Sequence, residues 1–312
     1  MKVSYKVPAT TANLGPGFDS LGMALPIYNI ITIEETILPS TGIEINVMQD
    51  VENSELIELD NIPEDKNNIV YKAVEMLYNL VGQDPSELKI NIRSNIPIAK
   101  GLGSSAAVIV GGLMAANELL GFPADEEALL SIATEAEGHP DNVVPAILGG
   151  LVMSSMEEDG SVIHRKLNWP EDWHITVCIP DFELATNISR SVLPELVPMQ
   201  DAKFNARRYA MLVHAINTKD SELMKAALED KLHQPYREKL VPGFIEIKEA
   251  LRHENNVLGT VISGAGPALI VISKKNNLEQ IRKVIKETWD NLNINSEIKT
   301  LHVEPNGASK IN

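Results

Sequence analysis

The chain has 312 residues, and its 43 Asp and Glu against 27 Lys and Arg give a formal net charge of −16 at pH 7. General binding to nucleic acid or to an anionic membrane needs a positive face, so this composition argues against both. With 44% hydrophobic residues the chain can bury two cores, and its length exceeds that of a usual single domain.

The only cysteine, Cys178, lies in an apolar run, which predicts a small buried residue there. With a single cysteine, no disulfide can form within the chain. The N-terminal residues 1–8 lack the apolar core of a signal peptide, and no uninterrupted apolar stretch is long enough to cross a bilayer. We therefore expect a cytoplasmic protein.

The first half predicts strands over 3–7, 27–35 and 43–47. A polar, acidic loop follows over 49–67, which we expect to be exposed. From Asn68 onward, apolar residues recur at helical spacing, and Gly82 and Pro85 end that helix. Residues 88–92 then alternate between apolar and polar, which predicts a half-buried strand.

Two glycines one residue apart come next and lead directly into an apolar helix. The segment comprises Pro97, Ile98, Ala99, Lys100, Gly101, Leu102, Gly103, Ser104, Ser105, Ala106 and Ala107. Glycine backbone lets an anion approach closely, and the unpaired N–H groups and dipole of a helix start stabilise a polyphosphate. Because Lys100 precedes the glycines, this is not a Walker P-loop. The segment predicts a phosphate cradle, and the competing interpretation is a tight turn whose serines cap a core helix.

The second half predicts a strand at 174–180, helices within 201–253, strands at 257–262 and 268–272, a helix at 277–291 and a strand at 297–303. This βαββαβ order is that of a ferredoxin-like domain. The glycines of 263–267 fall between two strands and lack the third glycine of a dinucleotide fingerprint, so they predict a turn. We expect an α+β fold with domains at 1–160 and 161–312.

The glycine-rich segments at 8–19, 97–107 and 263–268, with the segments 137–142 and 235–244, resemble the GHMP family of small-molecule kinases over nearly the whole chain. The resemblance implies an N-terminal α/β domain of the ribosomal-S5 type, a ferredoxin-like C-terminal domain and an active site between them. It implies that ATP phosphorylates the side-chain hydroxyl of L-homoserine, a step of threonine biosynthesis. A homodimer is a further expectation from the family.

The same resemblance assigns the phosphates of ATP to the cradle and Mg²⁺ to Ser105 and Glu137. A hard ion favours such oxygen ligands. Glu135 is the rival carboxylate, because this chain is shorter than many relatives between Glu137 and His139.

A zwitterionic amino acid needs an anionic partner for its ammonium group and cationic partners for its carboxylate. The resemblance implies Asp19 for the ammonium, Arg190 and Arg237 for the carboxylate, and Asn13 and His139 near the hydroxyl and the backbone. Singly, each residue is also explained as a turn former, a surface cation or a structural histidine. As a set, they match one amino-acid substrate.

Asn142 stands where several sister kinases carry an aspartate base. Since an amide cannot accept the proton, we expect the hydroxyl, aligned by Asn13, to lose its proton late to a phosphate oxygen. Asp141 is the alternative base. Two other functions stay open: a GHMP-type kinase acting on mevalonate or a sugar, and a nucleotide-binding sensor without turnover.

Overall fold

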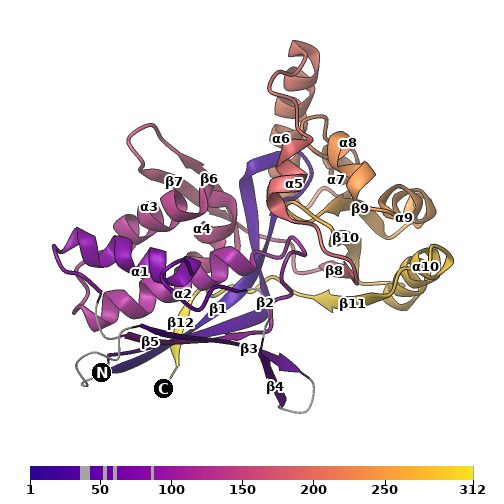
Figure 1. Ribbon diagram of the computed structural model, residues 1–312. Helices are drawn as coiled ribbons and strands as arrows, with labels where there is room; N and C mark the ends of the chain where they lie inside the picture. The colour runs from indigo at the N-terminus through magenta and orange to yellow at the C-terminus, as the bar shows by residue number, and fades with distance from the viewer. Residues whose placement is uncertain (36–42, 52–54, 59–61, 86–87, 312) are drawn as a thin grey trace.

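The structure is a computed structural model that describes residues 1–35, 43–51, 55–58, 62–85 and 88–311. These residues form one eight-stranded and one four-stranded sheet, both with helices packed against them, so the fold is α+β as predicted. Figure 1 shows the first half of the chain, in indigo to magenta, beside the second half, in orange to yellow. Among the described residues, no helix combines the length and the apolarity that a membrane crossing requires.

The first sheet has the order β12-β1-β2-β5-β3-β4, with β6 paired to β2 and β7 to β6. Its strands are β1 Lys2–Asn13, β2 Gly17–Glu35, β3 Glu44–Val51, β4 Glu55–Glu58, β5 Leu88–Ser94, β6 Leu151–Met156, β7 Val162–Leu167 and β12 Ser309–Ile311. β1 and β2 form a long antiparallel hairpin. The turn of this hairpin reaches the second half of the chain, where the Asn205 side chain donates to the Pro16 carbonyl at 3.0 Å.

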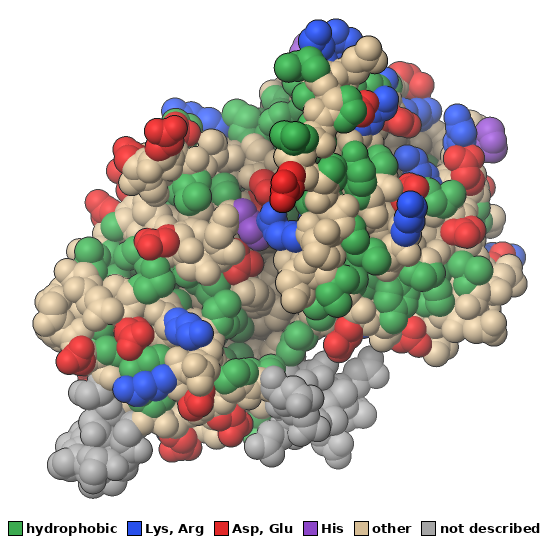
Figure 2. All heavy atoms as spheres, turned by 45° about the horizontal axis from the view of Figure 1, so that its top comes forward, with side chains coloured by type: hydrophobic (Ala, Val, Ile, Leu, Met, Phe, Trp, Pro, Cys, Tyr) green, Lys and Arg blue, Asp and Glu red, His purple; other side chains and the backbone are tan. Residues whose placement is uncertain are grey.

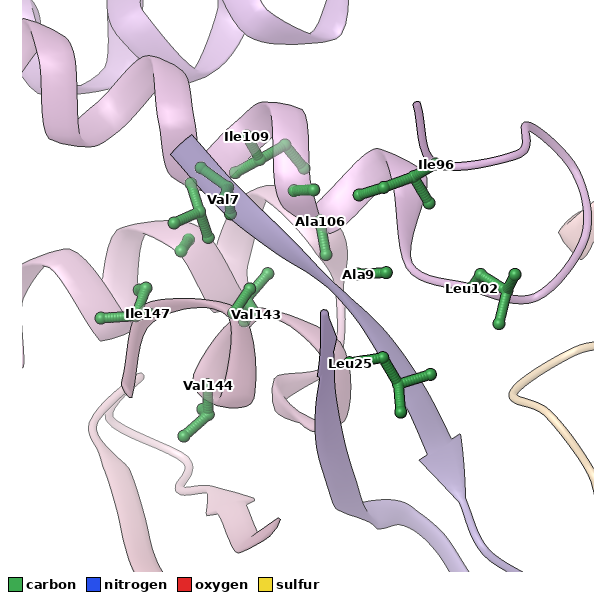
Figure 3. Packing of buried hydrophobic residues seen from close by; sticks show 14 of the residues in the cluster. Val7, Ala9, Leu25, Ile96, Leu102, Ala106, Ile109, Val143, Val144 and Ile147 are labelled. Atoms are coloured by element: carbon green, nitrogen blue, oxygen red, sulfur yellow. The ribbon is translucent and has the colours of Figure 1, made fainter. Parts of the chain in front are cut away.

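Four helices cover one face of this sheet: α1 Ile69–Leu80, α2 Ser104–Leu119, α3 Glu126–Glu137 and α4 Pro140–Leu148. Asn68 caps α1 by accepting a hydrogen bond from the Val70 amide, as helix starts require. α2 lies at the centre of the layer and packs on β1 and β2. Figure 3 shows side chains of α2 and α4, among them Ile109 and Val143, meeting those of β1 in this core.

The second sheet has the order β11-β8-β10-β9, which is the ferredoxin-like arrangement predicted from the element order. Its strands are β8 Trp173–Pro180, β9 Val257–Ile262, β10 Leu269–Lys274 and β11 Ser296–Leu301. The helices of this half are α5 Thr186–Ser191, α6 Met199–Thr218, α7 Ser221–Ala227, α8 Gln234–Arg237, α9 Phe244–Leu251 and α10 Leu278–Asn291, with a 3₁₀ turn at Glu238–Leu240. α10 buries Ile281, Ile285 and Trp289 at helical spacing.

The predicted acidic loop over 49–67 is partly wrong, because β3 continues to Val51 and β4 spans Glu55–Glu58. Residues 52–54 and 59–61 of that loop lie outside the described residues. The domain boundary predicted at residue 160 stays a prediction, and the two sheets do not divide the chain at that residue. β7 pairs with β6 in the first sheet, and β12 returns to β1, so both ends of the predicted second domain contribute to the first sheet.

Candidate active site

A cavity of about 340 Å³ lies between the two halves of the molecule. Figure 2 shows this hollow, with histidine, basic and acidic side chains gathered at its rim. Its walls come from the β1–β2 turn, the loop between β5 and α2, the start of α4, α5, the end of α8 and the β9–β10 turn. Most of the predicted site residues line it: Asn13, Asp19, residues 97–105, His139, Asp141, Asn142, Arg190 and Arg237.

The predicted cradle forms the floor of the cavity, and its backbone requires both glycines. Gly101 has a φ of +75° and Gly103 a φ of +67°. A Cβ on Gly101 would lie 2.2 Å from the Ser263 carbonyl oxygen, and one on Gly103 would lie 2.0 Å from Thr10 Oγ1. Glycine is therefore needed at both positions for its backbone freedom and for space.

The β9–β10 turn holds the cradle from the other half of the molecule. Ser263 Oγ donates to the Gly101 carbonyl at 2.6 Å, and the Ala268 amide donates to the Lys100 carbonyl at 3.0 Å. The prediction that 263–267 is a turn is thus confirmed, and the turn packs against the cradle. The two halves of the chain are joined at the place where a ligand would sit.

α2 starts at Ser104 and presents its first turn to the cavity. Among the described residues, no side chain caps this turn, and Gly103, Ser104 and Ser105 line the cavity. The free amides and the helix dipole create a site for an anion. Ala106 and Ala107, which the predicted cradle included, are fully buried in the core and do not line the cavity. Lys100 also lines it, although its ammonium group donates to the Phe182 carbonyl at 2.7 Å.

Glu137 reaches the edge of the cavity through Ser105, whose hydroxyl donates to Glu137 Oε2 at 2.8 Å. Burial raises the pKa of Glu137, although the hydrogen bond from Ser105 and the charge of His139 oppose the shift. Glu135, the rival carboxylate, is exposed on α3. Two oxygen ligands therefore meet beside the first turn of α2, which fits a hard divalent cation that keeps several waters.

A hydrogen-bonded row of side chains runs from β1 to the start of α4. Thr10 Oγ1 donates to Asn142 Oδ1 at 2.9 Å, Asn142 Nδ2 donates to Asp141 Oδ1 at 3.1 Å, and His139 Nδ1 lies 2.5 Å from the same oxygen. Burial favours the neutral form of His139, but the hydrogen bond and the charges of Asp141 and Glu137 outweigh it and raise the His139 pKa. Sequence reasoning missed Thr10, which lies within the 8–19 segment.

Asp19 and Arg190 form a bidentate ion pair across the cavity mouth, with N–O distances of 2.9 and 3.2 Å. Asp19 follows the β1–β2 turn and Arg190 lies on α5, so the pair also joins the two halves of the chain. Each side chain is about one-third exposed, at 36% and 37%. A zwitterionic ligand would replace this ion pair with two new ones: its cationic group would bind Asp19, and its anionic group would bind Arg190.

Arg237 lies behind this pair and is 1% exposed. It donates through Nε to the Ser189 carbonyl at 3.2 Å and through Nη1 to the Gly264 carbonyl at 3.0 Å. Burial and the charge of Arg190 lower the pKa of Arg237 to about 10, so its guanidinium stays charged at neutral pH. A carboxylate between the two arginines would relieve their repulsion.

The Asn13 side chain makes two hydrogen bonds within the protein that its predicted role did not include. Its Nδ2 donates to the Gly264 carbonyl at 2.9 Å, and its Oδ1 accepts from the Asp19 amide at 3.0 Å. Its backbone adopts a φ of +72°. Asn13 thus fixes the turn that carries Asp19, and one N–H of its amide group is not used by these contacts.

The far end of the cavity is apolar, and sequence reasoning did not identify it. It is lined by Val47, Ile62, Ile69, Ile92, Ile98 and Val108. These residues come from β3, the residues before α1, α1 itself, β5, the cradle and α2. No sequence motif joins them, because each belongs to the apolar pattern of a different element. The cavity therefore has an apolar end, a floor formed by the cradle and the uncapped start of α2, and a charged end.

Comparisons with known proteins agree with this architecture. The family model described as the GHMP kinases N terminal domain matches residues 68–150, and that described as GHMP kinases C terminal matches residues 212–291. The chain thus has the fold of a GHMP kinase, and residues of both matched domains line the cavity.

Similarity to individual relatives narrows the class. The chain is 43% identical to a homoserine kinase of Carboxydothermus hydrogenoformans, covering 98% of this chain and 96% of that protein. It is 40% identical to a homoserine kinase of Microchaete diplosiphon over 99% of this chain and 97% of that one. The crystal structure of homoserine kinase from Cytophaga hutchinsonii superposes with a TM-score of 0.86 at 28% identity, covering 99% of this chain and 97% of that chain. The chain belongs to the homoserine kinase family.

Proposed function

We propose that this chain transfers the γ-phosphoryl group of ATP to the side-chain hydroxyl of L-homoserine, forming O-phospho-L-homoserine for threonine biosynthesis. The single observation that carries the proposal is the order of surfaces in one cavity. An apolar end suited to a base adjoins the uncapped first turn of α2, and this turn adjoins the charged end with Asp19, Arg190 and Arg237.

The apolar end and the floor accommodate ATP. The adenine ring would pack among side chains such as Ile69 and Ile92, and the triphosphate would lie on the amides of residues 101–105. The Ser105 hydroxyl and the Glu137 carboxylate would hold Mg²⁺, which supplies positive charge to the phosphates when bound. Glu137 is the preferred carboxylate over Glu135, because Ser105 contacts Glu137 and Glu135 is exposed.

The charged end accommodates the amino acid. Its ammonium group would replace Arg190 at Asp19, and its carboxylate would bind between Arg190 and Arg237. This arrangement favours homoserine over mevalonate or a sugar, because those substrates have no ammonium group to satisfy Asp19. If Arg190 turned to the carboxylate of mevalonate, Asp19 would lose its partner, and an unpaired carboxylate in a partly closed cavity is costly.

Proton transfer needs no dedicated side-chain base in this site. Asn142 cannot accept a proton, and its Oδ1 is already bonded to Thr10. Asp141 faces His139, and protonating Asp141 would remove the negative charge beside the imidazole ring. The hydroxyl, oriented by the amide groups of Asn13 and Asn142, would therefore lose its proton late, to an oxygen of the transferring group.

The test is ADP release by the purified chain with Mg-ATP and a panel of acceptors. L-homoserine should stimulate release far above mevalonate, galactose, L-serine and no acceptor, and phosphorus NMR should show a phosphate monoester of homoserine. Preferential turnover of mevalonate or a sugar would replace the proposal with a sister activity. ATP binding without turnover on any acceptor would indicate a sensor.

A further inference from the structure

The buried side chain of His233 lies behind the charged end of the cavity, and no step above uses it. It immediately precedes α8 and is 0% exposed. Its Nδ1 lies 3.2 Å from Arg237 Nη1, and its Nε2 lies 2.8 Å from the Gly15 carbonyl oxygen. His233 thus touches both the arginine and the turn that precedes Asp19.

The partners of His233 determine its tautomer. A guanidinium nitrogen only donates, so Nδ1 must be the acceptor, and the ring proton is on Nε2, where it can donate to Gly15. Burial and the neighbouring Arg237 charge lower the pKa of His233, so the ring stays neutral. A fixed neutral imidazole is therefore the group that receives one N–H of Arg237.

Two further contacts hold His233 in place, and a third holds Arg237 beside it. The Asp230 carboxylate accepts from the His233 amide at 3.0 Å, which fixes the backbone at the start of α8. The Phe18 ring stacks on the imidazole with centroids 5.1 Å apart and planes 16° apart. The Arg237 guanidinium stands over the same Phe18 ring, 5.3 Å from its centroid. Phe18 and His233 together restrict the plane of the guanidinium.

We propose that His233 is a positioning residue for substrate binding. Its Nδ1 accepts a hydrogen bond from Arg237 Nη1, and this contact directs Arg237 Nη2 into the cavity toward the carboxylate of the amino-acid substrate. The contacts of Arg237 with Ser189, Gly264 and His233 use Nε and Nη1. In the described part of the chain, no hydrogen bond of Nη2 accompanies them, and Arg237 lines the cavity. This inference rests on the proposed function for the identity of the carboxylate.

Two substitutions of similar polarity separate the two contacts of the ring. His233→Asn places an acceptor oxygen near the position of Nδ1 and keeps the contact with Arg237, whereas His233→Gln places a donor near Nε2 and keeps only the contact with Gly15. Losing a hydrogen bond to a charged group corresponds to a weakening of roughly tenfold to a hundredfold.

We expect His233→Gln to raise the KM for homoserine about tenfold or more, with the KM for ATP unchanged, and His233→Asn to raise it only a few-fold. Thermal unfolding of both variants reports their stability, and a crystal structure of His233→Gln should show the Arg237 guanidinium displaced. Equal increases in the KM for homoserine in both variants, a parallel increase in the KM for ATP, or an unmoved Arg237 guanidinium would overturn the positioning role of His233. A wild-type chain that does not turn over homoserine would instead refute the proposed function, and the guanidinium position in the variant would still decide the role of His233.

Discussion

The substitution Gly101→Ala tests whether the cradle must keep its shape to transfer a phosphoryl group. The added Cβ would lie 2.2 Å from the Ser263 carbonyl oxygen and 2.8 Å from the Gly266 amide nitrogen. Both are backbone atoms, which cannot rotate away as a side-chain tip can. The cradle and the β9–β10 turn would have to separate by roughly 1 Å to restore ordinary contact.

Two costs follow from that geometry. Alanine at a φ of +75° is strained, at about 1–2 kcal/mol. The displacement would also break the hydrogen bond from Ser263 to Gly101 and move the amides that would hold the phosphates. A misplacement of about 1 Å can cost about a hundredfold in rate, so we expect kcat to fall at least about that much.

Gly121→Ala is the matched control. Gly121 has a φ of +78°, almost that of Gly101, but a Cβ there would meet nothing within 4 Å. This variant should lose a similar amount of stability to backbone strain and keep its kcat. The assay is homoserine-dependent ADP release at saturating substrates, with urea unfolding of both variants. A Gly101→Ala enzyme with nearly wild-type kcat would refute the reasoning.

Three further predictions address the charged side chains. Asp19→Asn should raise the KM for homoserine at least about tenfold and leave the KM for ATP unchanged, because it removes the proposed ammonium partner. Steady-state kinetics with each substrate varied in turn measures both KM values, and an unchanged KM for homoserine would contradict the prediction. Glu137→Gln should raise the Mg²⁺ concentration needed for half-maximal rate, whereas Glu135→Gln should not; equal effects in a Mg²⁺ titration would remove the assignment. The folded state raises the pKa of His139 above its ordinary 6.5, so His139 stabilises the fold fully at pH below 6.5 and loses this contribution as pH rises through the raised value. Urea unfolding from pH 5 to 9 should therefore show a decline that His139→Gln lacks, and parallel curves for the two proteins would count against the ion pair with Asp141.

Local patterns in the sequence were sufficient for most of the helices and strands. Helix α1 followed from apolar spacing, with Gly82 and Pro85 marking its end. The strand, cradle and helix at β5 and α2 followed from alternation, two glycines and an apolar run. The ferredoxin-like half followed from the order of its elements. These features depend on residues close together in the chain, whose preferences are visible in a short window.

The acidic segment that contains β4 was predicted as a loop because its composition is polar. An edge strand is selected by pairing with a neighbour, here β3, and not by its own residues alone. The sequence analysis did not predict β7 and β12 for the same reason, because their places in the first sheet depend on pairing with β6 and β1.

The sequence by itself determined the glycine cradle, and its resemblance to the family supplied the other candidate groups: a serine and carboxylates for a metal, and opposite charges for an amino acid. Only the tertiary structure decided that Asp19 meets Arg190, 171 positions away, that Asn13 and Arg237 both donate to the Gly264 carbonyl, and that His233 lies between Arg237 and the Gly15 turn. The apolar end of the cavity likewise exists only where β3, α1, β5 and α2 converge. Residue type sets what a side chain can do, whereas packing of distant elements sets which side chains face each other across one cavity.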